Sequence, residues 1–453
     1  MSGKGYIYFL GIGGIGMSAI ARYFHLQGEK VCGYDRTPTE LTEELIKEGI
    51  PVVFVDDVSS VPDNISRVIW TPAIPRTNHI FRHFVELGVT MHKRSAVLGE
   101  ITSQYPNIAI AGTHGKTTTG TIVSHLLAYN KFPVTAFLGG VSVNYRNNFI
   151  HLGNQWMIEE ADEYDQSFLQ LNPDIAVITA VDADHLDIYG SRTKMLEGYA
   201  AFAGKVRNGG LLLLGPHITE SDRNFLKKSV HHSVRILNYG HGEGSVQCTI
   251  RTSNSGWMGF DYIDEEGRRA AELSMRLPGQ HNIENATAAI RIALELGISQ
   301  LDIREALLSF KGIRRRFEWL HEGSQVLIDD YAHHPEELRA AIAALRQCYP
   351  NRKLLGIFQP HLFTRTRDFA QQFAEVLDQL DDIILVELYP AREEPLDGIS
   401  SYTILDKMKN PHSAFIRKED LLENLKNYQT DVIALLGAGD LSAMQDQIIK
   451  ILR

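Results

Sequence analysis

A glycine- and threonine-rich loop with a lysine is the part of this sequence best suited to do chemistry. It lies between an apolar run at 108–110, which predicts a buried strand, and residues 119–129, which predict a helix. The loop reads Ala111-Gly112-Thr113-His114-Gly115-Lys116-Thr117-Thr118-Thr119. Backbone N–H groups at such a helix start bind phosphate, lysine adds charge, and a threonine hydroxyl can bind Mg²⁺. The loop is two residues shorter than the general pattern G-x-x-x-x-G-K-[ST], but the order of elements still predicts a nucleoside triphosphate site.

A second glycine turn lies near the start of the chain. Gly11-Ile12-Gly13-Gly14-Ile15-Gly16 follows a predicted strand at 6–10 and opens a predicted helix, and Asp35 ends a further strand at 30–34. This pattern, with an acidic residue about 20 positions on, is typical of dinucleotide-binding folds. Taken alone it favours a NAD-dependent dehydrogenase, but a diphosphate-containing sugar nucleotide fits the same helix start. The residues leave both ligands open.

Acidic residues follow two predicted strands of the middle segment. Glu160 ends the strand at 156–160 within the run Glu159-Glu160-Ala161-Asp162-Glu163-Tyr164-Asp165, and we expect it to hold Mg²⁺. His185 stands among aspartates after the strand at 175–180 and suits a second metal ion. The alternatives are a solvated acidic loop and a surface histidine held by a neighbouring aspartate.

Three later motifs are predicted to position substrates. His281-Asn282-Ile283-Glu284-Asn285 opens a helix over 279–296, where amides spaced by three suit a purine edge or simply cap the helix. Asp329–Pro335 and Gln359–Arg367 follow strands predicted at 325–328 and 353–358, so both fall at one sheet edge. No third ligand stands at zinc-like spacing from the histidine pair, which favours substrate positioning.

Composition limits the class of protein. The chain has 453 residues, 44% of them hydrophobic and 22% charged, with a net charge of −10 and three cysteines. The length predicts two to four domains, and the alternation of predicted strands and helices along the chain predicts that they are α/β domains with parallel sheets. The net charge argues against a nucleic-acid or anionic-membrane surface. Few, widely spaced cysteines and the lack of an 18-residue apolar run or leader-like start predict a cytoplasmic protein.

In this order the motifs resemble the Mur ligase family over nearly the whole length. They read GIGGIGM at 11–17, AGTHGKTTT at 111–119, EADE at 160–163, DADHLD at 182–187, GQHNIENA at 279–286, RRFE at 315–318, DDYAHHP at 329–335 and QPHLFTRTRD at 359–368. The short glycine loop, which fits the general pattern poorly, fits this family well.

The resemblance implies three domains and one reaction. Residues 1–103 would form a Rossmann-like UDP-sugar-binding domain, 104–321 a central ATP-binding domain of P-loop type, and 322–453 a Rossmann-like amino-acid-binding domain. ATP, with two Mg²⁺ ions, would drive ligation of L-alanine to the lactyl carboxylate of UDP-N-acetylmuramate through an acyl phosphate, in peptidoglycan precursor synthesis. The last two motifs point to the alanine-adding member, and the member that attaches a recycled tripeptide is the alternative. The protein would be a monomer or homodimer.

The resemblance also assigns residues to roles. ATP-binding residues are Gly112, Thr113, His114, Gly115, Lys116, Thr117, Thr118, His281, Asn282, Asn285, Arg316 and Asp330. UDP-sugar-binding residues are Gly11, Ile12, Gly13, Gly14, Ile15, Gly16, Asp35, Thr71 and Arg94. Amino-acid-binding residues are Tyr331, His333, His361 and Arg365; metal ligands are Thr117, Glu160 and His185; catalytic residues are Lys116, His185, His333 and Arg365.

Two positions depart from the family pattern. Ala180 stands where relatives commonly have Asn, and Leu362 stands where some members have Arg after His361. Two further classes remain open at this stage: a dehydrogenase built on the first glycine turn, and a non-catalytic nucleotide-dependent regulatory module.

Overall fold

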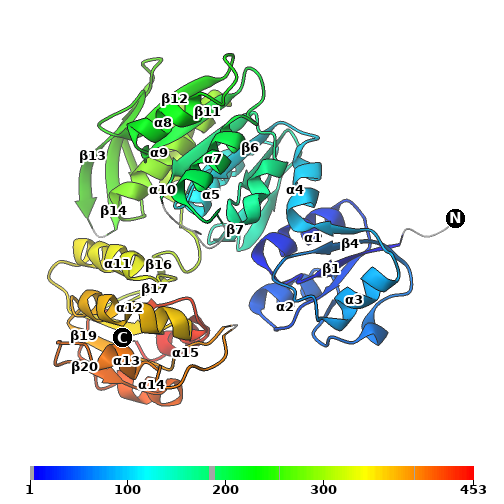
Figure 1. Cartoon of the computed structure of the whole chain (residues 1–453). Helices are drawn as coiled ribbons and strands as arrows, with labels where there is room; N and C mark the ends of the chain where they lie inside the picture. Colours follow the sequence, from blue (N-terminus) through cyan, green and yellow to red (C-terminus); the bar gives the residue numbers. More distant parts are fainter. Residues whose placement is uncertain (1–4, 183–188, 255, 392, 453) are drawn as a thin grey trace. The chain divides into compact units, whose positions relative to one another are not determined.

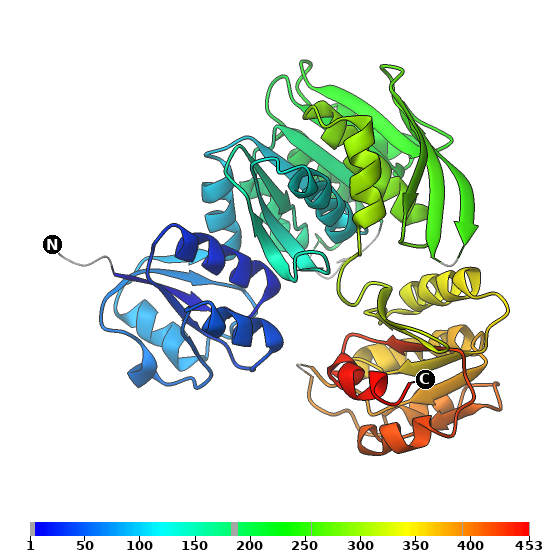
Figure 2. The same ribbon diagram turned by 180° about the vertical axis from the view of Figure 1, so that it is seen from behind.

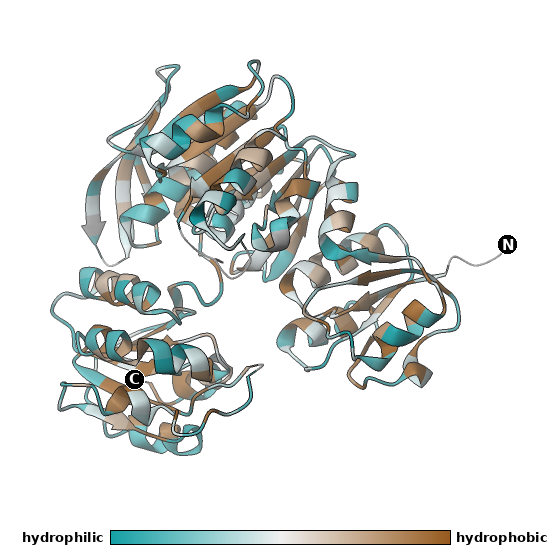
Figure 3. Cartoon of the chain, in the orientation of Figure 1, coloured by the Kyte–Doolittle hydropathy of each residue, from teal (hydrophilic) through white to brown (hydrophobic). Residues whose placement is uncertain are grey.

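A computed structural model describes residues 5–182, 189–254, 256–391 and 393–452. Among these residues the strands, labelled where there is room in Figure 1, form three sheets. The chain divides into two compact units. The first unit comprises residues 1–249, 260–273 and 281–310, and the second comprises 250–259, 274–280 and 311–453. Strands of all three sheets carry the most apolar residues, shown brown in Figure 3, because burying them drives the packing.

The first sheet has the parallel strand order β3-β2-β1-β4-β5. Leu10 of β1 pairs with Tyr34 of β2 and Trp70 of β4, so the residues that follow these strands leave the sheet at one level. The elements are β1 Tyr6–Leu10, α1 Ile15–Leu26, β2 Val31–Tyr34, α2 Glu40–Lys47, β3 Val52–Val53, η1 Val58–Ser60, β4 Ile65–Trp70, α3 His79–Glu86, β5 Met91–Lys93 and α4 Arg94–Thr102.

The second sheet has the order β15-β14-β13-β12-β11-β10-β6-β9-β7-β8. Helices α5 and α10 lie side by side (Figure 2), where Nε2 of His125 contacts the Ala306 carbonyl oxygen at 2.9 Å. The elements are β6 Asn107–Ala111, α5 Lys116–Tyr129, β7 Val134–Ser142, β8 Asn147–His151, β9 Trp156–Glu160, η2 Tyr164–Gln170, β10 Ile175–Ala180, α7 Arg192–Ala203, β11 Leu211–His217, α8 Glu220–Lys227, β12 Arg235–His241, β13 Val246–Asn254, β14 Trp257–Ile263, β15 Arg269–Met275, α9 Gln280–Glu295 and α10 Gln300–Ser309.

The third sheet has the order β16-β17-β21-β18-β19-β20. Leu436 of β21 pairs with both Asp330 of β17 and Phe358 of β18, so the motifs after β17 and β18 begin at one level. The elements are β16 Glu318–Glu322, β17 Val326–Asp330, α11 Pro335–Cys348, β18 Leu354–Phe358, α12 Phe363–Leu377, β19 Asp382–Leu385, α13 Tyr402–Leu405, β20 Ser413–Phe415, α14 Lys418–Leu425, β21 Val432–Leu436, η3 Leu441–Met444 and α15 Gln445–Ile449.

The α/β fold predicted from the alternation of elements is confirmed, and two edge strands add antiparallel pairs to the predicted parallel pairing. β8 is antiparallel to β7, and β16 is antiparallel to β17. Each is joined to its partner by a short turn, as in a β-hairpin. No helix in the described ranges combines the length and apolar character needed to cross a membrane.

Candidate active site

The phosphate loop joins β6 to α5 in the conformation that its glycines permit. Gly112 and Gly115 have φ of +130° and +81°, and α5 begins directly after Gly115, at Lys116. A Cβ at Gly112 would collide with the Thr179 hydroxyl, and one at Gly115 would lie 2.7 Å from Oδ1 of Asn285. The loop is therefore packed against β10 on one side and α9 on the other.

Hydrogen bonds tie the rest of the loop to the end of β10. The Thr113 N–H donates to the Ala180 carbonyl at 3.1 Å, and the Asp182 N–H donates to the Thr113 hydroxyl at 3.2 Å. Nε2 of His114 lies 3.6 Å from Oδ2 of Asp182. Thr118, in the first turn of α5, is buried. The loop is thus held in shape by its own sheet.

Lys116 is fixed at the mouth of the loop by two acceptors. Its ammonium donates to the Gly112 carbonyl at 2.6 Å and to Oε1 of Glu163 at 2.8 Å. Glu163 is buried, and it was not among the predicted site residues although its acidic run was. The sequence signals for it were that run, which begins in β9, and the motif EADE at 160–163.

Thr117 and Glu160 form the pair expected for a metal ion. The Thr117 hydroxyl donates to Oε2 of Glu160 at 3.2 Å, and Oε1 of Glu160 accepts the Gly139 N–H at 2.8 Å. One carboxylate and one hydroxyl, completed by phosphate and water, match the oxygen ligands of Mg²⁺. Within the described ranges no group of three or more His, Cys, Asp or Glu is placed to hold a metal. His185 lies outside those ranges.

At the start of α9, Glu284 forms an ion pair that the sequence did not predict. It lies between Asn282 and Asn285, which are expected to bind adenine. Asn282 and Asn285 are buried, and His281 is exposed. Nε2 of His217, at the end of β11, lies 3.1 Å from Oε2 of the buried Glu284, and this hydrogen bond raises the pKa of His217. The two residues are 67 positions apart, so no sequence pattern indicated that they pair.

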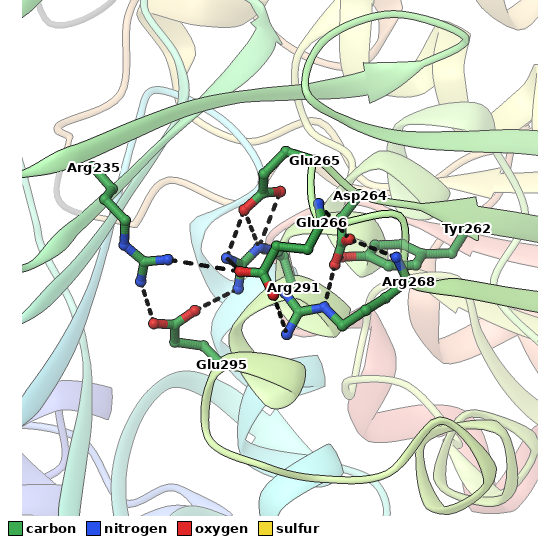
Figure 4. A network of polar contacts seen from close by, with 8 residues as sticks. All are labelled: Arg235, Tyr262, Asp264, Glu265, Glu266, Arg268, Arg291 and Glu295. Carbon is green, nitrogen blue, oxygen red and sulfur yellow. Dashed lines mark hydrogen bonds and ion pairs between the residues drawn. The ribbon is translucent and has the colours of Figure 1, made fainter.

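The far half of α9 is anchored by a buried arginine. Arg291 is fully buried, with Nη2 at 2.7 Å from Oε1 of Glu265 and Nη1 at 2.7 Å from Oε2 of Glu295 (Figure 4). Glu265 belongs to the turn between β14 and β15, so the network fixes α9 to the sheet. A buried arginine with several carboxylate partners restricts its helix to one position.

Around the first glycine turn the structure gathers the residues predicted to bind the sugar nucleotide. The Gly13 N–H donates to Oδ2 of Asp35 at 2.8 Å. A Cβ at Gly11 would lie 2.8 Å from Cγ2 of Thr71, and one at Gly16 would lie 2.6 Å from Nη1 of Arg94. The turn residues Ile12 and Gly14 lead into α1, which begins at Ile15. Oδ1 of Asp35 also accepts the Thr37 N–H at 3.2 Å, so its carboxylate links the glycine turn to the residues that follow β2.

In the second unit four neighbouring rings follow the strands β17, β18 and β19. Ring centroids are 5.2 Å apart for Tyr331 and His333, 5.9 Å for His333 and His361, and 5.8 Å for His361 and Tyr389. Nη1 of Arg365 lies 3.5 Å from Nδ1 of His361. The four residues predicted to bind the amino acid are therefore together. Tyr389, which was missed, follows β19, the next strand of the same sheet edge.

Two residues predicted near the nucleotide belong to the second unit. Asp330 accepts the N–H of Phe317 at 2.8 Å and of Ala332 at 2.9 Å, and burial raises its pKa to about 6. The Arg316 N–H donates to the Ile313 carbonyl at 3.1 Å. Asp330 thus secures the backbone at 317 and 332.

The fold and the phosphate loop together define an α/β protein with a loop suited to the phosphates of a nucleotide. Three family descriptions match in order: "Mur ligase family, catalytic domain" over residues 6–106, "Mur ligase middle domain" over 110–293, and "Mur ligase, glutamate ligase domain" over 315–439. The chain belongs to the Mur ligase family, as the motifs predicted, and is an ATP-dependent amide-bond-forming ligase.

Several named proteins and solved structures are similar to this chain over nearly its whole length. Proteins named UDP-N-acetylmuramate–L-alanine ligase are 43% identical in Flavobacterium johnsoniae, over 98% of this chain and 97% of the relative, and 42% identical in Porphyromonas gingivalis, over 97% of each. The crystal structure of UDP-N-acetylmuramate–alanine ligase from Thermotoga maritima is similar, with a TM-score of 0.84, 28% identity and 98% of both chains covered. A murein peptide ligase from Psychrobacter arcticus shares the fold, with a TM-score of 0.72 and 21% identity.

Proposed function

We propose that this chain joins L-alanine to the lactyl carboxylate of UDP-N-acetylmuramate at the expense of ATP, in peptidoglycan precursor synthesis in the cytoplasm. The observation that carries the proposal is the match, at about 42–43% identity over nearly the whole chain, to relatives that bear this activity in their names. Residues 1–103, 104–321 and 322–453 would bind the UDP-sugar, ATP and the amino acid.

The first step transfers phosphate. The sugar's lactyl carboxylate attacks the γ-phosphate of ATP, releasing ADP and forming an acyl phosphate. Two anions must meet, so Lys116 and the N–H groups of residues 112–118 stabilise the charge on the transferring group. Thr117 and Glu160 would hold Mg²⁺, with His185 at a second ion, and bound Mg²⁺ supplies charge neutralisation at the phosphates.

The second step forms the amide. The amine of L-alanine attacks the acyl carbonyl and phosphate leaves. Nδ1 of His333 lies 2.9 Å from the Tyr331 carbonyl and 3.2 Å from Oε2 of Glu337, two acceptors that favour a proton on Nδ1. Nε2 is then free of a proton and able to take one from the attacking amine. Arg365 and His361 would bind the alanine carboxylate.

Binding residues follow the same division. The turn Gly11–Gly16 with Thr71, Arg94 and Asp35 would bind UDP-N-acetylmuramate, with its diphosphate at the N-terminus of α1. His281, Asn282 and Asn285 would bind adenine, where an amide offers donor and acceptor together. Arg316 and Asp330 are proposed nearer the rest of the nucleotide.

One experiment tests the function. Phosphate release is measured with ATP, Mg²⁺ and UDP-N-acetylmuramate while the amine is L-alanine, glycine, L-serine or the tripeptide of the recycling ligase. We expect L-alanine to give the highest kcat/KM. The value for glycine should be lower, because one methyl group contributes about 1–3 kcal/mol to transition-state binding. Preference for the tripeptide would assign the alternative family member instead, and NADH binding without phosphate release would revive the dehydrogenase.

A further inference from the structure

Leu362, between β18 and α12, has a backbone conformation that leucine rarely adopts. Its φ is +69° and its ψ is 135°, at the residue that precedes α12. A side chain in this region is strained, and such strain persists only where the surroundings hold it. Leu362 lies next to His361 and three residues before Arg365, both proposed to bind the amino acid.

The residues after β19 hold this conformation from one side. The Leu362 N–H donates to the Tyr389 carbonyl at 3.0 Å, and the Tyr389 N–H donates to the Pro360 carbonyl at 2.8 Å. The ring of Tyr389 stacks on the ring of His361 at 15°. Backbone and ring contacts thus fix His361 in place.

Glu393 holds the other side, at the first turn of α12. Leucine cannot cap a helix, and Glu393 does so instead: Oε2 accepts the Thr364 N–H at 3.0 Å, and Oε1 accepts the Thr364 hydroxyl. Bonds from Thr364 and the charge of Arg365 lower the pKa of Glu393 against the opposing effect of its burial, so the carboxylate is ionised at neutral pH.

We propose, resting on the function above, that Glu393 is a positioning residue for amino-acid binding, which fixes the first turn of α12 so that Arg365 and His361 receive the substrate carboxylate. Because the anionic Glu393 occupies the start of α12, the backbone N–H groups of the first turn do not bind the substrate carboxylate. It is received by the guanidinium of Arg365. Selectivity for an α-amino acid over other amines then depends on a residue that does not touch the substrate.

The test separates amino-acid binding from the earlier step. Glu393→Gln keeps the shape of the side chain and removes the charge, Glu393→Ala removes the cap, and Glu394→Gln is the matched control on the neighbouring exposed carboxylate. We expect both Glu393 variants to raise KM for L-alanine tenfold or more, and to change KM for ATP and UDP-N-acetylmuramate less than twofold. Glu394→Gln should match the wild type.

Hydroxylamine supplies a second readout. It attacks an acyl phosphate and has no carboxylate, so Arg365 is not needed. We expect Glu393→Gln to keep wild-type hydroxylamine-dependent phosphate release. An unchanged KM for L-alanine in both variants overturns the proposal, and so does a parallel loss with L-alanine and hydroxylamine, which marks a merely structural role. If the wild type itself releases no phosphate with L-alanine, the proposed function fails, and that is seen before any variant is made.

Discussion

The ammonium of Lys116 lies 2.8 Å from Oε1 of Glu163, a carboxylate with only 1% of its surface exposed. Tyr189 donates its hydroxyl proton to the Glu163 carbonyl at 2.7 Å, so the segment that carries the carboxylate is itself fixed. The cation is therefore held in place before a triphosphate arrives, and little reorganisation is needed during phosphate transfer.

Replacing Lys116 should remove activity, and a second substitution should separate this effect from a loss of stability. We expect Lys116→Ala to lower substrate-dependent phosphate release about 10²–10³-fold, the usual cost of losing one preorganised donor. The variant also removes the ammonium that pairs with the buried Glu163 carboxylate, and losing one partner of a buried ion pair is destabilising. Lys116→Ala/Glu163→Gln should therefore recover thermal stability without recovering activity, and phosphate release near the wild-type rate in either variant would exclude the role of the lysine.

Glu160 should set the requirement for Mg²⁺. An amide oxygen in its place is neutral and binds a hard cation weakly. We expect Glu160→Gln to raise the Mg²⁺ concentration for half-maximal phosphate release by about tenfold or more. Replacing even a residue that only hydrogen-bonds to a metal ligand lowers metal affinity about 10–100-fold. Glu159→Gln is the control, because adjacent strand residues point to opposite faces of the sheet. An unchanged Mg²⁺ dependence would assign the metal to other groups.

Features that depend on neighbouring residues could be predicted from the sequence. Both glycine loops, the strands before them and the helices after them stand where their spacing indicates, because a strand, a turn and a helix start are local. The grouping of Tyr331, His333 and His361 also followed, since carboxyl ends of parallel strands share an edge. Tyr389 after β19 obeys the same rule.

Contacts made by packing could not be predicted. Glu163 pairs with a lysine 47 residues away, and Glu284 with a histidine 67 residues away, and no periodicity links such positions. The start of α12 lies at Phe363, inside the motif at 359–367. Its cap comes from Glu393, 29 residues beyond Thr364, and no capping residue precedes the helix to mark its start.

His333 should act only as a neutral imidazole. Burial lowers its pKa below 6.5, Glu337 opposes this, and Arg365 adds to it. Protonation at acid pH should therefore reduce kcat/KM for L-alanine along a limb below pH 6.5. Removing the Glu337 charge as Glu337→Gln should move that limb to lower pH. His333→Asn should lower the rate about 10²–10⁴-fold and abolish the limb; a limb that persists would belong to another group.

Glu159 should make the protein less stable as the pH rises. It is fully buried on β9, opposite Ala109 and Phe137, and neither carboxyl oxygen has a hydrogen-bond partner in the described part of the chain. Burial raises its pKa well above 4.5, and the charge of Asp174 adds to this. Because the folded pKa exceeds the unfolded one, its contribution to stability is full below about pH 4.5 and is lost as the pH rises.

Glu159→Met removes the buried carboxyl and keeps a side chain of similar length. We expect its free energy of unfolding to exceed that of the wild type by about 1–3 kcal/mol at pH 8, the cost of one unpartnered buried polar group, and by less at pH 5. Glu159→Gln should show the same loss of pH dependence with a smaller gain, since a buried amide still lacks partners. Urea unfolding at both pH values measures the difference. A gain in the free energy of unfolding that does not grow with pH would mean that Glu159 is ionised and paired in solution. Phosphate release by both variants should stay at the wild-type rate, because Glu159 faces away from Thr117.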